Sequence, residues 1–522
     1  MYRIIFLSLV ALCWFGTPLV SNSYAESETA TQKPNVLFIA VDDMRDWVGY
    51  LGGYKGQVLT PNIDRLADRG TPFTNAHCAS PVCCPSRAAV MSGRFPSSTG
   101  IYNNGQWWKP HLPNLTTLPV HFKNNGYEAV GAGKLFHHTV GNNPPGQWDA
   151  YHRLIFEDDA FSRTTGRITP LYPFTAFQPF PEEFPLSGIK LYSNEVDWGV
   201  LQKPEPQFDD AKTATYAIDY LKQKHDKPFF LACGLFHPHL PWYVPPKYLE
   251  LYNAKDPVLP KVKADDLDDV PEPGKKLALR KNDDLLRLYK ANKWNTAVQH
   301  YLASISFADA QIGRLLDALE ESPHADNTIV VLWSDHGWHF GEKNHWHKRT
   351  LWEEATRVPL IIMTPNTLHA GTRCAQPVSL VDLFPTLIDL CQLPPVEKLS
   401  GQSLVPLLKD PTANWSHTAV TEDENQHCAV RDIRYRYIRY NDGSEELYDM
   451  QTDPLQWNNL AGDPEMKPIK ARLAQSIPQT WAAHAETKKS YQFEPFSYRW
   501  THKKTGQVTE GGSSLILNGL KK

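Results

Sequence analysis

The chain has 522 residues, of which 41% are hydrophobic and 21% are charged, and its formal net charge is −4. This hydrophobic fraction is enough for a buried core and excludes a wholly disordered chain. A net charge so near zero argues against a nucleic-acid-binding protein that depends on a basic surface. No apolar run reaches the roughly 18 residues of a membrane span, so we expect none.

The first 25 residues have the features of a secretory signal peptide. Arg3 gives the positive start, residues 4–15 are apolar, and Ser23-Tyr24-Ala25 is a small-x-small cleavage site. The polar stretch that follows argues against the alternative, a buried N-terminal helix. We therefore expect residues 1–25 to be removed and the mature protein to be periplasmic or secreted.

Strands and helices alternate between residues 35 and 393. Continuous apolar runs predict buried strands, and apolar residues at helical spacing predict helices. The expected strands are 35–41, 128–130, 228–233, 327–333 and 358–363. The expected helices are 61–69, 118–125, 211–224, 295–321 and 378–393. Residues 255–291, with mixed charge and prolines, are expected to be an exposed excursion. The alternation predicts an α/β fold with a large, mostly parallel sheet flanked by helices.

The pattern changes near residue 410. Residues 430–440 alternate with a period of two, Asn441-Asp442-Gly443 is a turn, and Glu446-Leu447-Tyr448 restarts the alternation. These features predict an antiparallel hairpin. We therefore divide the mature chain into an N-terminal domain at 26–409, a small C-terminal subdomain with an antiparallel sheet at 410–500, and a polar tail at 501–522.

Polar residues follow four of the predicted strands directly. These residues are Asp42 and Asp43, Lys134 and His137, His237 and His239, and Asp335 and His336. Ligands of parallel α/β sheets bind beyond the carboxyl ends of the strands, so we expect these side chains to form one site. Asp42 and Asp43 are neighbours and can converge only where the strand stops and turns. A helix N-cap is the alternative for a single Asp. A carboxylate-rich set favours Ca²⁺ or Mg²⁺, and His336 leaves Mn²⁺ or Zn²⁺ open.

The most specific motif is Cys83-Cys84-Pro85-Ser86-Arg87, followed by Ser92-Gly93-Arg94. It resembles the type I sulfatase signature Cys-x-Pro-Ser-Arg with a downstream Thr-Gly-Arg, in which the leading cysteine is oxidised to formylglycine. Only Cys83 has Pro at +2 and Arg at +4, so Cys84 occupies the variable position. A pair of small buried cysteines in a loop is the alternative interpretation.

The resemblance to this family extends along most of the chain. The matching segments occur in the family's order and are Val41-Asp42-Asp43, residues 133–137, 238–241 and 334–337, Lys348, and residues 446–449. Having His336 where many sulfatases carry Asn makes the chain most similar to the iduronate-2-sulfatase-like branch. The resemblance implies an alkaline-phosphatase-like fold with a mixed, mostly parallel sheet and a C-terminal antiparallel subdomain.

The resemblance also implies a role for each candidate residue. Hydrated formylglycine at position 83 would attack sulfur, and one cation, Ca²⁺ by preference with Mg²⁺ or Mn²⁺ possible, would acidify it. The implied metal ligands are Asp42, Asp43, Cys83, Asp335 and His336. His239 would protonate the leaving sugar oxygen, and His137 would remove the proton whose loss expels sulfate. Lys134 and Lys348 would neutralise the sulfate oxygens, and Arg87 would orient the hydrated aldehyde.

Together these features favour an exported sulfatase that acts on a sulfated oligo- or polysaccharide. Such an enzyme needs a formylglycine-generating enzyme or an anaerobic maturase as a partner. One alternative is a phosphonate monoester or phosphodiester hydrolase of the same superfamily. The other is a catalytically silent carbohydrate-binding protein with an unmodified Cys83. Trp107 and Trp108 are expected to line the substrate cleft, with core packing as the alternative, and His237 is either a pocket ligand or a loop residue.

Overall fold

The computed structural model describes residues 33–139, 141–152, 181, 183–189, 197–280, 284–494 and 497–512. The signal peptide expected at residues 1–25 lies outside this part of the chain. Contacts divide the chain after Lys33, and the unit that begins at Pro34 contains all the elements described below. Among the described residues, no helix combines the length and the apolar character needed to cross a membrane.

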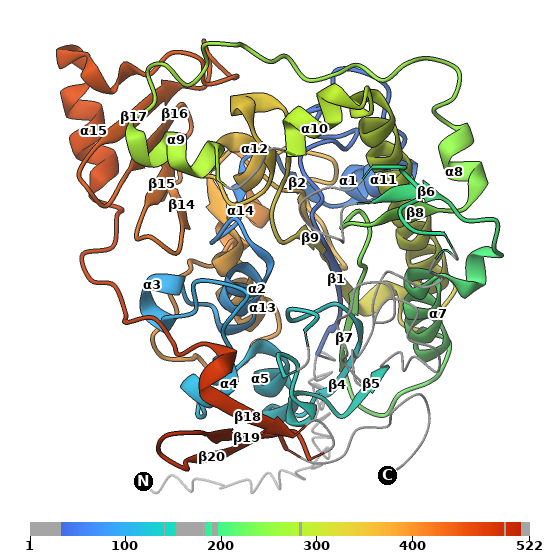
Figure 1. Cartoon of the computed structure of the whole chain (residues 1–522). Coiled ribbons are helices and arrows are strands. Elements are labelled where there is room, and N and C mark those ends of the chain that lie inside the picture. The colour runs from blue at the N-terminus through green and yellow to red at the C-terminus, as the bar shows by residue number, and fades with distance from the viewer. Residues whose placement is uncertain are drawn as a thin grey trace, which may run out of the picture. The chain divides into compact units, whose positions relative to one another are not determined.

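The largest sheet of the described residues is mixed and mostly parallel (Figure 1). In order across the sheet, its strands are β2 (Thr71–Phe73), β12 (Leu360–Met363), β9 (Thr328–Ser334), β1 (Asn35–Val41), β7 (Phe229–Gly234), β4 (Glu128–Gly133) and β5 (Ala150–His152). Strand β1 pairs in parallel with β7 and β9, and β4 and β5 continue the parallel arrangement. Strand β12 is antiparallel to both β9 and β2. The expected α/β architecture is confirmed.

Helices cover both faces of this sheet. Alternate side chains of β1 belong to two different cores, as the period of a strand requires. Leu37 and Ile39 pack with helices α1, α7 and α11, whereas Val36 and Phe38 pack with α2, α5 and α13. These helices are α1 (Pro61–Arg69), α7 (Asp209–Leu221), α11 (Trp294–Glu320), α2 (Cys83–Ser92), α5 (Leu118–Asn124) and α13 (Leu383–Leu390). Burial on both faces explains why the central strands are continuous apolar runs.

The helix expected at 378–393 is shorter than the apolar pattern suggests. Val378–Ser379 is strand β13, which pairs with β3 (Ala76–His77), and a 3₁₀ turn at Leu380–Asp382 precedes α13. Ser379 and Asp382 form a reciprocal capping box, which satisfies the backbone N–H groups at the start of the turn. The capping residue therefore lies outside the helix, and this part of the prediction is wrong.

The exposed excursion expected at 255–291 is also partly wrong. It contains helices α9 (Glu272–Ala278) and α10 (Asp284–Lys290), whose Leu277 and Leu285 are buried. Asp266 forms a buried ion pair with Lys343, whose Nζ lies 2.7 Å from Asp266 Oδ1. The sequence pattern did not reveal these helices, because a helix of seven residues has only two or three buried positions and the residues around them are charged.

The C-terminal part contains two antiparallel sheets. The first is β14 (Ala419–Glu422), β15 (Cys428–Arg431), β16 (Tyr435–Arg439) and β17 (Glu445–Asp449). The second is β18 (Tyr491–Glu494), β19 (Arg499–His502) and β20 (Val508–Glu510). The hairpin expected around Asn441-Asp442-Gly443 is present between β16 and β17.

Residues 430–440 are two strands and not one. Asp432 Oδ1 accepts hydrogen bonds from the backbone N–H groups of Arg434 and Tyr435, at 2.7 and 2.5 Å, and this turn ends β15. The polar tail expected at 501–522 is likewise in part a sheet, because its first residues belong to β19 and β20. Residues 513–522 lie outside the described part of the chain.

Candidate active site

The two neighbouring aspartates converge because the backbone turns where β1 ends. Asp43 has a φ of 57°, in the left-handed region that L residues seldom adopt. Its backbone N–H donates to Asp335 Oδ1 at 3.1 Å, and the hydroxyl of Tyr301 on α11 donates to its carbonyl at 2.8 Å. Asp335 directly follows β9, the parallel neighbour of β1. The strand ends therefore meet as the sequence predicts.

Cys83 begins helix α2 and faces this cluster. Its Sγ lies 3.2 Å from His336 Nε2 and 3.3 Å from Lys348 Nζ, and the residue is 1% exposed. Cys84 makes different contacts. Its N–H donates to Asn104 Oδ1 at 2.9 Å, and its Sγ lies 3.7 Å from Asn142 Oδ1. The geometry supports the choice of Cys83 over Cys84.

Three cationic side chains pair with the three aspartates. Lys134 Nζ contacts Asp42, and Lys348 Nζ lies 2.6 Å from Asp43 Oδ1. Arg87 Nε lies 2.7 Å from Asp335 Oδ2, and an Nη of Arg87 lies 3.3 Å from Asp42 Oδ1. The other donors of Arg87 reach backbone carbonyls at Val41, Lys134 and Leu135. The guanidinium of Arg87 therefore binds the carboxylates of Asp42 and Asp335 and the backbone carbonyls at the ends of the strands.

The donor set is one that a cation fits. Ligand atoms of Asp42, Cys83, Asp335 and His336 lie within 4.8 Å of one another, and Asp43, Cys83 and His239 form an overlapping group. Asp42 Oδ1 is buried and has no hydrogen-bond partner among the described residues. Burial and the nearby charge of Asp335 raise the pKa of Asp42. A divalent cation bound to Oδ1 would give this buried carboxylate a ligand in addition to its ion pairs with Lys134 and Arg87.

The two candidate proton-transfer histidines, His239 and His137, differ in their surroundings. His239 Nδ1 lies 2.6 Å from the Leu240 carbonyl, which leaves Nε2 facing Asp43 at 3.8 Å. The ring of His137 lies 4.5 Å from that of His138, and its buried Nδ1 has no hydrogen-bond partner in the described part of the chain. Burial and neighbouring positive groups hold the pKa of both His137 and His239 well below the usual range.

His237 is a structural residue. Its Nδ1 lies 2.7 Å from Asp210 Oδ2 and its Nε2 lies 3.0 Å from the Tyr243 carbonyl. Both ring nitrogens are thus engaged, which settles the choice that the sequence left open.

Trp107 and Trp108 do not form the expected cleft wall. Trp107 packs against Phe493 and Trp500 of the last sheet, and Trp108 stacks on Phe136. Both are buried. The alternative of core packing is correct here, because the second sheet at the C-terminus covers Trp107.

Lys488 is a residue of this region that the sequence did not reveal. Its Nζ donates to Thr139 Oγ1 at 2.5 Å, and its charge helps to lower the pKa of His137. Burial lowers the pKa of Lys488 to about 8. No local pattern marks Lys488 as a site residue, because its partner Thr139 lies 349 residues away in the sequence.

The sulfatase family profile matches residues 34–393, and the profile for the C-terminal part of N-sulphoglucosamine sulphohydrolase matches residues 341–483. The first match covers well over half of the chain. The chain therefore belongs to the sulfatase family, has its alkaline-phosphatase-like fold, and is a sulfuric ester hydrolase.

Two relatives and one solved structure illustrate the similarity. A sulfatase of Formosa agariphila is 35% identical over 510 residues, with 94% of each chain covered. Iduronate 2-sulfatase of Homo sapiens is 30% identical, with 88% of this chain and 87% of the relative covered. The structure of a phosphonate monoester hydrolase of Agrobacterium radiobacter has a TM-score of 0.68 at 20% identity, covering 88% of this chain and 98% of that one. This last likeness concerns the fold alone.

Proposed function

We propose that this sulfatase is exported and releases sulfate from a sugar hydroxyl of a sulfated oligo- or polysaccharide. The observation that carries the proposal is the position of Cys83. Its Sγ lies 3.3 Å from the Lys348 ammonium, and the residue lies beside the buried carboxylates that follow β1 and β9. The similarity to iduronate 2-sulfatase over most of both chains favours a sulfated sugar as substrate. The proposal that the protein is exported rests on the signal-peptide features of residues 1–25.

The proposed cofactor is one divalent cation held by Asp42, Asp43, Asp335 and His336, with position 83 completing the set. The carboxylate oxygens favour Ca²⁺, with Mg²⁺ or Mn²⁺ as alternatives. Support comes from Asp42 Oδ1, which accepts no hydrogen bond from the described residues, and from the raised pKa of that carboxyl group. When bound, the cation would neutralise sulfate charge and acidify the oxygen nucleophile that a formylglycine at position 83 supplies when hydrated.

Formation of that aldehyde from Cys83 requires a formylglycine-generating enzyme or an anaerobic maturase. The thiol is buried at the start of α2 in the folded chain, with 1% of the residue exposed. We therefore propose that the maturase acts before this part of the chain has folded.

Lys134 and Lys348 are proposed to bind the sulfate oxygens. Their ammonium groups now neutralise Asp42 and Asp43, and a cation at these carboxylates would release both groups toward an anionic substrate. Arg87 is proposed as a positioning residue, because its donors already hold Asp42, Asp335 and the strand-end carbonyls.

His239 is proposed to protonate the leaving sugar oxygen. Burial, Lys134 and Lys348 lower its pKa in the substrate-free protein. A sulfate between the two lysines would offset their charge and raise that pKa, so the proton would be held when substrate is bound. His137, with a lowered pKa and a free Nδ1 among the described residues, is proposed to accept a proton as sulfate leaves.

The proposal is tested with a panel of sulfated oligosaccharides and with aryl sulfate and aryl phosphonate esters as controls. We expect sulfate release from at least one sugar with a higher kcat/KM than on either aryl ester. Mass spectrometry of the Cys83 peptide should show formylglycine. Activity confined to phosphonates or phosphodiesters would contradict the proposal, and an unmodified Cys83 in inactive protein would favour a carbohydrate-binding role.

A further inference from the structure

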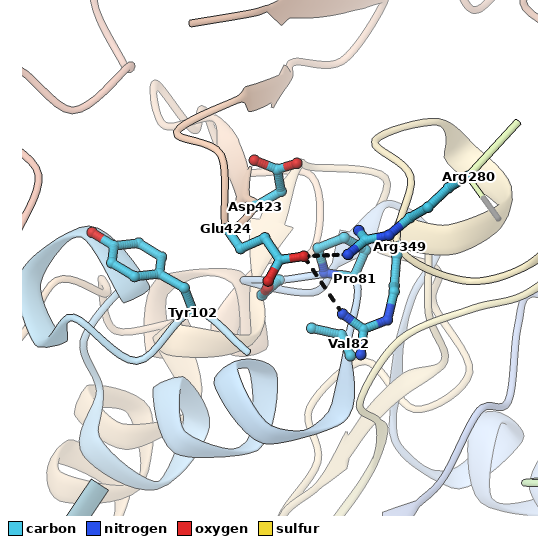
Figure 2. Close-up of a pocket in the computed structure, with 8 residues that line it drawn as sticks. Pro81, Val82, Tyr102, Arg280, Arg349, Asp423 and Glu424 are labelled. Carbon is cyan, nitrogen blue, oxygen red and sulfur yellow. Dashed lines mark hydrogen bonds and ion pairs between the residues drawn. The ribbon is translucent and has the colours of Figure 1, made fainter. Parts of the chain in front are cut away.

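A pocket opens beside the candidate active site. The empty space at this hollow, open solvent included, is about 220 Å³, and Figure 2 shows Arg280, Arg349 and Glu424 meeting in it. Two of its walls are continuous with the catalytic segments. Val82 precedes Cys83, Arg349 follows Lys348, and the Arg349 N–H donates to the Pro81 carbonyl at 3.0 Å. A group bound here would therefore lie next to a group bound at Cys83.

The pocket contains two guanidinium groups and a single carboxylate between them. Glu424 Oε1 lies 2.5 Å from Arg280 and 3.9 Å from Arg349 (Figure 2). Within the described residues, the guanidinium of Arg349 donates no hydrogen bond, since 3.9 Å is too long for one. Asp423 does not balance this charge, because its carboxylate accepts the backbone N–H groups of Asn425 and His427. Among the described residues, the guanidinium of Arg349 is therefore paired only with Glu424, at 3.9 Å.

The backbone holds Arg349 in an unusual conformation. Its φ is 77°, and that of His347 is 98°, both in the left-handed region. Such angles are uncommon for residues other than glycine and cluster at binding and catalytic sites. The surroundings bury much of Arg349, and burial together with the charge of Arg280 lowers its pKa. A strained, poorly neutralised arginine that faces a pocket is suited to an anionic ligand.

We propose that Arg280 and Arg349 bind a second oxyanion of the saccharide, a carboxylate or a sulfate on the sugar residue next to the one that loses its sulfate. This inference rests on the proposed function. The ligand oxyanion would displace the carboxylate of Glu424, which lies between the guanidinium groups of Arg280 and Arg349 in the free protein. Guanidinium groups match planar or tetrahedral oxyanions with paired hydrogen bonds, which explains two arginines where one lysine would neutralise the charge.

The test uses the mature protein and three sulfated disaccharides. One carries a neighbouring uronate carboxylate, the second has that carboxyl group reduced to an alcohol, and the third carries a neighbouring sulfate. The measured quantity is the ratio of kcat/KM for each charged disaccharide to that of the reduced one. This ratio cancels general damage to folding or maturation, and comparing the two charged arms identifies which oxyanion the pocket receives.

We expect wild type to prefer a charged disaccharide. Arg349→Gln and Arg280→Gln should each lower the ratio by about tenfold or more, mainly through KM, as the loss of a charge-assisted hydrogen bond predicts. Arg69→Gln is the matched control, since Arg69 on α1 pairs with Glu320 on the surface and should keep the wild-type ratio. Glu424→Gln should raise the ratio, because it removes the competing carboxylate.

Equal kcat/KM for charged and reduced disaccharides in wild type would overturn the inference while leaving the sulfatase proposal intact. So would an equal loss on both substrates in Arg349→Gln and Arg280→Gln, which would assign the arginines a structural role. A lower ratio in Glu424→Gln would contradict the displacement of that carboxylate. Failure of wild type to release sulfate from any sugar is a different result, and it would overturn the proposed function itself.

Discussion

The site around Cys83 and the pocket around Glu424 share a wall but are built differently. The paired side chains of Arg87 and Asp42 are 0% exposed, whereas those of Arg280 and Arg349 are 38% and 31% exposed. Removing one partner from a buried ion pair is costly, so the inner charges must act as a set. Partly exposed pairs contribute little to stability, so a ligand can replace Glu424 in the outer pocket. The site around Cys83, here called the inner region, therefore suits catalysis by rigidly held charges. The pocket around Glu424, here called the outer pocket, suits binding of a substrate group.

The two adjacent cysteines give the sharpest test of the inner region. Cys83→Ala should lower kcat by about 10⁴-fold or more, as expected when the nucleophile is lost. Cys84→Ala should retain turnover within severalfold, because Cys84 packs against the Asn104 and Asn142 segments. Sulfate release is the measurement, and circular dichroism checks that both variants are folded. Wild-type turnover in Cys83→Ala would invalidate the catalytic scheme.

Removing the cation should affect the inner region far more than the outer pocket. Removal of divalent cations with EDTA should reduce sulfate release by about a thousandfold, since charge stabilisation in the transition state is lost. Added Ca²⁺ should restore activity, and elemental analysis should find about one equivalent. Thermal melting should also shift downward, because a ligand at 100 times its Kd stabilises by about 2.7 kcal/mol. Full activity without any bound metal would contradict the proposed cation site.

His239→Gln separates acid catalysis from binding. We expect a drop in kcat of about a hundredfold on a sugar sulfate, whose alkoxide is a poor leaving group and needs a proton. The loss on an aryl sulfate should be much smaller, because a phenolate leaves without protonation. The matched comparison is His237→Gln, which removes a residue bonded to Asp210 and not to the site. Equal losses on both esters in His239→Gln would argue against the acid role.

Lys488 should give the smallest effect, and it depends on pH. With a pKa of about 8, its ammonium is charged below that pH and loses its proton above it. If it attracts the anionic substrate, KM should rise by about fivefold between about pH 7 and pH 9, corresponding to a contact of about 1 kcal/mol.

The control is Lys488→Arg, whose guanidinium stays charged over this range. Its KM should vary much less with pH than that of wild type. A similar rise in both proteins would assign the pH dependence to another group, such as one of the site histidines.

The inner region was predictable because its residues lie in short motifs tied to the strands. The run at 35–41 predicted β1, and the doublet that follows it required a turn, which Asp43 makes at a φ of 57°. Parallel pairing of β1 with β7 and β9 then brings the polar residues that follow these strands to the same edge of the sheet. The outer region was not predictable in this way. Arg280 and Glu424 are separated by 144 residues, and no local pattern pairs them.

The sequence by itself determined the α/β order of the elements, the register of the cysteine motif and the strand-end residues, because apolar periodicity and motif spacing are local properties. Only the tertiary structure decided that Trp107 is core, that His237 is structural, and that Lys488 donates to Thr139. It also decided that part of the connection carrying Arg280 packs against the C-terminal sheet through Val270, Leu277 and Ala278. Those outcomes depend on which distant surfaces pack together, and burial and charge pairing between distant segments leave no periodic signal in the chain.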